Sequence, residues 1–138
     1  MKKRIIIGLL GIGLLACDND TIQHEELFID SSNTLNIYET KLNTPNNISL
    51  SMDAVLSDSR CPEGAMCIWA GNAKARYLLS VNGSNDTIVL NTHQGPEFPS
   101  DTTLHGYTFN LEEISPYPHI DKSIEYINYS SRVTISKE

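Results

Sequence analysis

In AKARYLLSVNGSNDTIVLNT, residues 73–92, apolar and polar side chains alternate on both sides of an Asn-Gly pair. Alternation with a period of two places one face of a strand in a core and the other face in water. Asn82 and Gly83 both tolerate the positive φ that a tight hairpin turn requires. The stretch therefore predicts two antiparallel strands, with a turn over residues 82–86 and a return strand over residues 87–92.

The same period recurs on both sides of this hairpin. Residues 48–56 alternate before it, residues 104–113 predict a strand after it, and a last strand is expected over about residues 125–136. No segment keeps a helical period over three turns. We therefore predict an all-β chain that forms a single antiparallel β-sandwich or small barrel of about six or seven strands. The expected core-facing sets are Ile48, Leu50, Met52, Ala54 and Leu56, and Ala73, Ala75, Tyr77, Leu79 and Val81.

The chain begins with the composition of a secretory leader. Three cations at residues 2–4 precede an apolar run over residues 5–15, which as a helix would rise about 16 Å, roughly half the thickness of a bilayer core. Leu14-Leu15-Ala16-Cys17 then resembles the lipobox of bacterial lipoproteins. The resemblance implies attachment of lipid to Cys17 and cleavage after Ala16.

These features predict three parts of the chain. Residues 1–16 are expected to be a cleaved lipoprotein signal peptide, residues 17–33 a flexible lipidated tether, and residues 34–138 the sandwich domain. Two or more acyl chains hold a protein stably on a membrane. Asp18 directly after the cysteine resembles an inner-membrane retention signal of enterobacteria, whereas the acidic stretch Asp18-Asn19-Asp20 resembles a surface-export signal of Bacteroidetes. The Asn- and Ile-rich composition favours the second resemblance, and with it the outer membrane or cell surface of a bacterial envelope over the inner membrane.

Charge excludes one class of partner. The net charge is −7, and removal of the leader takes three cations and no acids, which leaves −10. A polyanion is repelled by nucleic acid and by anionic lipid headgroups. We therefore expect a monomer that is held on a membrane by lipid, that binds no nucleic acid, and whose protein or glycan ligand the sequence does not identify.

The two remaining cysteines predict a structural disulfide. Cys61 and Cys67 have the spacing C-x5-C, which is neither a redox C-x-x-C motif nor half of a zinc site. Closing so short a loop contributes about 2–2.5 kcal/mol on the chain-entropy model. No free thiol is then left as a nucleophile, and G-x-S-x-G is absent, so we expect no enzyme and no cofactor.

The sequence around this pair resembles a motif of small bacterial secreted proteins and lipoproteins. Residues 58–73 fit D-S-R-C-P-x4-C-x-W-A-G-x-A. The resemblance implies a β-rich exported domain, and it supplies no activity and no catalytic residue. From the residues themselves we expect Asp58 and Arg60 to pair across a turn at under about 1 kcal/mol if exposed. Trp69 is expected to pack near the disulfide, with stacking on a ligand as the alternative.

The histidines do not form a recognisable metal motif. His93, His105 and His119 lack the spacing of known sites, and they could form one only if their loops converged. We therefore predict no metal site.

Together these observations predict a binding or structural accessory module. Loops on rigid sheets usually carry recognition, and residues 58–72, 93–103 and 114–123 are the expected loops. Two alternatives remain: an inhibitor of a secreted hydrolase that uses the Cys61–Cys67 loop as a wedge, which an exposed Met66 would favour, and a periplasmic metal carrier. The candidate binding surface comprises Arg60, Glu63, Met66, Trp69, Phe98 and Tyr117.

Overall fold

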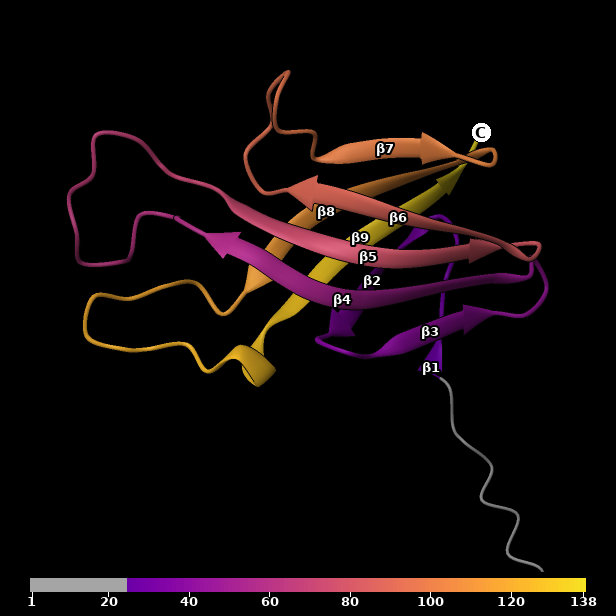
Figure 1. Ribbon diagram of the computed structural model, residues 1–138, viewed down its shortest axis with the longest axis horizontal. Coiled ribbons are helices and arrows are strands. Elements are labelled where there is room, and N and C mark those ends of the chain that lie inside the picture. Colours follow the sequence, from indigo (N-terminus) through magenta and orange to yellow (C-terminus); the bar gives the residue numbers. More distant parts are fainter. Residues whose placement is uncertain (1–24) are drawn as a thin grey trace, which may run out of the picture.

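The computed structural model describes residues 25–138, which form two sheets packed face to face (Figure 1). Within the two sheets, all pairings between labelled strands are antiparallel except the short parallel pair of β1 and β3. The sheets do not close into a barrel, so the sandwich is confirmed. The first sheet, in spatial order, contains β1 (Glu25–Glu26), β3 (Thr40–Asn43), β4 (Ile48–Asp58), β5 (Ala73–Val81) and β6 (Ser84–Asn91). The second contains β2 (Ser31–Asn36), β9 (Ser130–Lys137), β8 (Tyr107–Ser115) and β7 (Asp101–Leu104).

The predicted hairpin is β5–β6, and it is tighter than expected. Val81 pairs with Ser84, so only Asn82 and Gly83 form the turn. Their φ angles are 50° and 85°, as a two-residue turn with the twist of the flanking strands requires. The return strand therefore begins three residues before the expected start.

The core lies between the sheets and is formed by the alternating residues of β4, β5, β8 and β9. The largest buried side chains are Tyr77 and Phe109, one from each sheet. The alternation predicted for β4 is correct as far as Met52 and wrong after it. Register shifts between Met52 and Ala54 and between Val55 and Ser57 exchange the faces, so Val55 packs against the core and Leu56 is exposed.

Two further boundaries were predicted wrongly. The expected loop over residues 93–103 contains the start of β7, which forms a hairpin with β8 through a turn at His105 and Gly106. Both turn residues have positive φ. The expected last strand is preceded by a 3-10 turn, η1 (Tyr126–Asn128), so that β9 begins only at Ser130.

The predicted tether is wrong for residues 25–33, which belong to the folded domain. The Leu27 side chain is fully buried, and side-chain amides hold the backbone around it. Asn43 donates from Nδ2 to the Leu27 carbonyl (2.8 Å), and Asn33 exchanges two hydrogen bonds with the backbone of Phe28 (2.7 and 2.8 Å). The signal peptide, Cys17 and the rest of the predicted tether lie outside the described residues.

The long connections gather at one end of the sandwich. In Figure 1 the β4–β5 and β8–η1 loops extend to the left, and the β6–β7 loop rises from the left-hand end of β6, whereas the β5–β6 and β7–β8 turns lie at the right. Irregular backbone therefore presents side chains to solvent at this end, which we call the loop end.

No helix within residues 25–138 has the length and apolar character needed to cross a bilayer.

Candidate functional site

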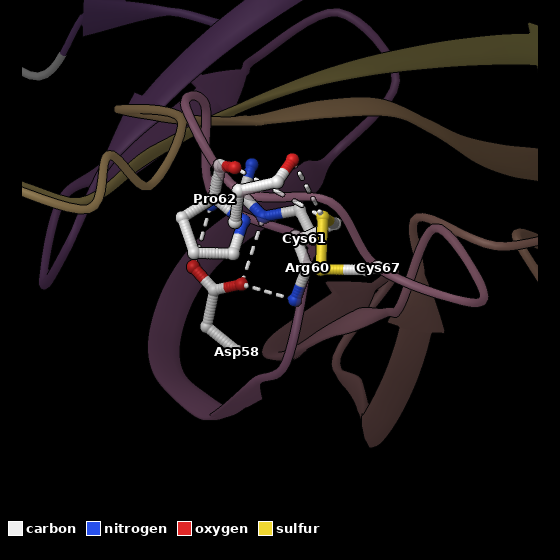
Figure 2. Close-up of a disulfide and its surroundings, with 6 residues drawn as sticks. Asp58, Arg60, Cys61, Pro62 and Cys67 are labelled. Carbon is white, nitrogen blue, oxygen red and sulfur yellow. Dashed lines mark hydrogen bonds and ion pairs between the residues drawn. A yellow bond between two sulfur atoms is a disulfide. The ribbon is translucent and has the colours of Figure 1, made fainter.

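The β4–β5 connection, residues 59–72, is closed by the disulfide between Cys61 and Cys67, whose Cα atoms are 5.9 Å apart (Figure 2). We call this segment the disulfide loop. It extends from the end of β4 to the start of β5, two strands that pair along almost their whole length. The predicted disulfide is confirmed.

A buried ion pair forms the base of the disulfide loop. Arg60 approaches Asp58 with two nitrogens, Nε to Oδ1 at 2.8 Å and Nη2 to Oδ2 at 2.6 Å (Figure 2). The two side chains are only 5% and 9% exposed. The guanidinium also donates to the carbonyls of Ile114 and Pro116, and the Tyr129 hydroxyl donates to Asp58 Oδ2 at 3.1 Å. The pairing was predicted, but its burial was not.

The surroundings of Asp58 favour its charged form. Burial alone would raise the pKa of this carboxyl, but the hydrogen bonds from Arg60 and from the Tyr129 hydroxyl outweigh burial, and the pKa lies below its ordinary value. The guanidinium of Arg60 therefore interacts with groups of the protein itself and does not face solvent. Its place in the predicted binding surface is wrong, because every charged atom faces an internal acceptor.

The neighbouring β8–η1 loop is bonded to the disulfide loop. The Glu63 amide donates to the Pro118 carbonyl at 2.9 Å, and the Ile120 amide donates to the Glu63 carbonyl at 3.1 Å. The Tyr117 ring lies 4.9 Å from the Arg60 guanidinium carbon, within cation–π range. The two loops are thus joined by backbone hydrogen bonds and by an aromatic contact.

Gly71 is the point at which the two sides of the disulfide loop approach each other. Its φ is +76°, and a Cβ there would lie 1.9 Å from the carbonyl oxygen of Ser59. The approach allows Ser59 to donate to the Asn72 carbonyl (2.8 Å) and Cys61 to donate to the Ala70 carbonyl (2.7 Å). Only glycine fits this position, which accounts physically for the glycine in W-A-G.

Asn72 connects the disulfide loop to the β6–β7 loop and was not among the predicted site residues. Its Nδ2 donates to Oδ1 of buried Asn91 (2.8 Å), and its Oδ1 accepts from the His93 amide (3.1 Å). Asn91 in turn donates to the Pro99 carbonyl (3.1 Å). An asparagine just before an alternating strand was the only available signal.

Above this braced base, the disulfide loop exposes apolar side chains. Met66 and Ile68 are as exposed as in an extended peptide (103% and 105%), and Trp69 is 62% exposed. We call these three residues the apolar tip. The prediction that Trp69 packs inward is wrong, because backbone bonds and Gly71, rather than the indole ring, hold the disulfide loop in place.

The structure brings together most of the predicted surface. Glu63, Met66 and Trp69 lie on the disulfide loop, and Tyr117 lies on the loop bonded to it, where Ile120 is a further exposed apolar residue that the sequence did not single out. Phe98 lies in the third loop of the same end and is half-buried. A hollow of about 230 Å³ next to Arg60 and Tyr117 is lined partly by Glu112 and Glu113.

The three histidines do not converge. His105 lies in the β7–β8 turn, where its Nε2 is 2.6 Å from Asp86 Oδ2, whereas His93 and His119 lie in loops of the opposite end (Figure 1). Within residues 25–138, no three His, Cys, Asp or Glu side chains are grouped as metal ligands. The metal-carrier alternative therefore gains no site from the described fold.

Comparison with family models, with curated proteins and with solved structures gives no significant match.

Proposed function

We propose that this chain is a lipid-anchored, exported binding module of the bacterial envelope, with Cys17 as the lipidated residue and the apolar tip at the centre of its binding surface. The observation that carries the proposal is the exposure of Met66, Ile68 and Trp69 on a loop that a disulfide and a buried ion pair hold in shape. Protein monomers rarely leave contiguous apolar groups in water without a use for them.

The bracing matters because it lowers the entropic cost of binding. A loop already fixed in its bound conformation loses little freedom when it meets its ligand. The base of the disulfide loop is fixed by the Asp58–Arg60 pair, by the Cys61 backbone hydrogen bond and by the close approach at Gly71. One side of the loop is fixed by the backbone hydrogen bonds that Glu63 and Ile120 make with each other's loops. Such a loop is suited to presenting side chains rather than to catalysis.

Photo-crosslinking in the native cells tests the binding surface. A photoreactive residue at Ile68 is expected to give a discrete adduct, whether protein, glycan or lipid. The matched control is Leu78, an exposed apolar residue on the outer face of β5. Adducts at neither position, or equal adducts at both, would contradict the proposal.

The anchor has a separate test. Mass spectrometry of the chain from native membranes is expected to find Cys17 as the first residue, with acyl chains on its sulfur and amino terminus. An intact Met1, or an unmodified Cys17 thiol, would contradict the anchor and leave the binding surface untouched.

A second candidate is an inhibitor of a secreted hydrolase, and the full exposure of Met66 at the turn of the disulfide loop favours it. A rigid convex loop fits a concave active site. Titrating the chain against purified envelope hydrolases would support inhibition if residual activity falls stoichiometrically and Met66→Glu removes the effect. Unchanged activity across the panel would exclude it for those enzymes.

A further inference from the structure

We infer that the ligand of the apolar tip is a zwitterionic phospholipid bilayer, into whose interfacial region Met66, Ile68 and Trp69 insert. This inference rests on the proposed function and names the partner of the same surface. Residues 64–71, GAMCIWAG, contain no charged side chain and none with a hydroxyl or amide group. Solvent-exposed loops of soluble domains are seldom so uniformly apolar.

Among the charged residues nearest the tip in sequence, Arg60 has its guanidinium neutralised by Asp58 and buried at the base of the loop. Lys74 is partly buried on β5, and Glu63, the exposed charge of the disulfide loop, precedes the uncharged stretch. The three residues of the apolar tip could therefore enter a bilayer interface without carrying a charged side chain themselves. Trp69 has an apolar ring with one N–H donor, which suits the level of the headgroups.

The adjacent loop adds a second point of contact. Ile120 is 54% exposed and is held beside the disulfide loop by its hydrogen bond to the Glu63 carbonyl. Tyr117 is half exposed above Arg60, with its ring fixed by the cation–π contact. Aliphatic tips with flanking aromatic rings are the composition of segments that lie in a membrane interface.

The chain between the anchor and the fold is long enough for this end to reach the membrane. Seven residues lie between Cys17 and Glu25, and the eight Cα-to-Cα steps span at most about 29 Å when fully extended. Glu25 lies level with Leu50 of β4, through the pairing of both with Lys41, and from Leu50 to Asp58 the strand runs about 26 Å. A tilted sandwich can thus place both its lipid and its loop end on one bilayer.

Charge selects the kind of lipid. Glu63, Asp121 and Glu125 are exposed in or beside the two loops, where Lys122 is the exposed cation, and the whole chain is acidic. Anionic headgroups repel such a surface, whereas zwitterionic headgroups do not. We therefore expect phosphatidylcholine vesicles to bind the chain more strongly than vesicles that contain phosphatidylglycerol, with the difference shrinking at high salt.

Trp69 is the only tryptophan, so its emission reports on the apolar tip alone. The test uses residues 17–138 with Cys17→Ser, which retains every described residue and removes the acyl anchor. With phosphatidylcholine vesicles, the emission is expected to move to shorter wavelength and to be quenched by brominated acyl chains. Ile68→Glu should lower the vesicle-bound fraction in flotation by about tenfold or more, because it replaces buried apolar area with a charge.

Leu78→Glu is the matched control, since it adds the same charge at an exposed leucine of the sheet face and should leave flotation unchanged. Unchanged Trp69 emission with vesicles, equal losses in both variants, or stronger binding to phosphatidylglycerol would overturn the inference. If vesicles have no effect while Ile68 crosslinks to one protein in native cells, the bilayer is excluded and the proposed binding surface stands. If neither occurs, both fail.

Discussion

Single residues decide whether the disulfide loop keeps its shape, and Gly71 is the most constrained of them. A side chain at this position meets the Ser59 carbonyl at 1.9 Å from Cβ while the backbone is held at positive φ. The clash is with backbone on a paired strand end, so no side-chain rotation relieves it. The loop base must therefore open to accept any other residue.

Gly71→Ala is accordingly expected to destabilise the domain by at least about 3 kcal/mol, through strained φ together with displaced backbone. Gly83→Ala is the control, because Gly83 has a similar φ of +85° and nothing within 4 Å of its added Cβ. That variant should lose about 1 kcal/mol. Urea unfolding measures both, and equal losses would show that the close approach at Ser59 is unimportant.

Arg60 carries the second prediction at this scale. Removing one partner of a buried ion pair costs about 3–5 kcal/mol, because the other charge stays buried without compensation. Arg60→Ala should show such a loss, whereas Arg76→Ala should lose under about 1 kcal/mol. The second pair, Arg76–Asp53, is as short (2.5 Å) but partly exposed. Similar losses in the two variants would contradict the importance of burial.

Tyr77 provides a prediction of the opposite sign. Its hydroxyl and that of Ser131 are buried close to each other between the sheets, but neither makes a hydrogen bond of good geometry within the described fold. An unpaired buried hydroxyl is costly, so Tyr77→Phe should leave the free energy of unfolding unchanged or raise it. Tyr77→Ala, by contrast, should cost about 3–5 kcal/mol through the cavity that it leaves. A clear loss in Tyr77→Phe would indicate a hydrogen bond to buried water.

At the scale of elements, the disulfide loop and the sandwich are separable. The Asp58–Arg60 pair and the hydrogen bonds of Ser59 and Asn72 hold the base, while the disulfide encloses only the five residues 62–66 above it. Reducing the bond should therefore loosen the apolar tip and leave the strands intact.

The double variant Cys61→Ser, Cys67→Ser should lose about 2–2.5 kcal/mol, as expected for closure of a short loop. Hydrogen exchange is expected to accelerate at the Cys61 and Ala65 amides, which bond within the loop, and to stay slow at the Tyr77 amide in β5. Accelerated exchange along β4 and β5 would show instead that the bond supports the sheet.

Elements were predictable from sequence where alternation was unbroken. Turn residues with positive φ identified the β5–β6 hairpin, and alternation identified the buried faces of β5 and of β4 as far as Met52. After Met52, two register shifts change which side chains of β4 point to the core. Nothing in the sequence of residues 52–57, MDAVLS, indicates the unpaired residue that each shift requires. β7 was missed because its four residues lack apolar alternation.

The candidate site was only half predictable for a related reason. Cysteine spacing, together with the expected secretory leader, is enough to predict the disulfide, and the Asp58–Arg60 pair follows from its position at a turn. The conformation of the disulfide loop, and with it the exposure of Trp69, depends on hydrogen bonds to residues 114–120, which are far away in sequence. The same long-range contacts bury Arg60.

The whole molecule is expected to lose stability in acid. The pKa of Asp58 is lowered, and that of Glu112 is lowered by hydrogen bonds from Thr134, Arg132 and Ser32. A carboxyl with a depressed folded pKa contributes stability that is fully present above its unfolded pKa and is lost as pH falls through the folded pKa. Between neutral pH and about pH 5, the contribution of Asp58 and Glu112 to the free energy of unfolding should not change with pH, and it should decline below about pH 4.

Thermal unfolding from pH 7 to pH 2 measures this decline. Asp58→Asn should start from lower stability and show a shallower acid decline than the native chain, because one linked proton is removed. An unaltered slope would mean that Asp58 is not a source of the acid sensitivity.

The burial of Leu27 has a mechanical consequence. In the proposed anchoring, the lipid is joined to the domain through the chain that enters the fold at β1, so a force transmitted by the lipid reaches the protein there. β1 pairs through only two residues, but Leu27, the next residue in the sequence, is fully buried, and its carbonyl accepts a hydrogen bond from the Asn43 side chain. Under such a force the Leu27 side chain must leave the core and become exposed to water before any longer strand separates from its sheet. The core therefore opposes the first step of mechanical unfolding.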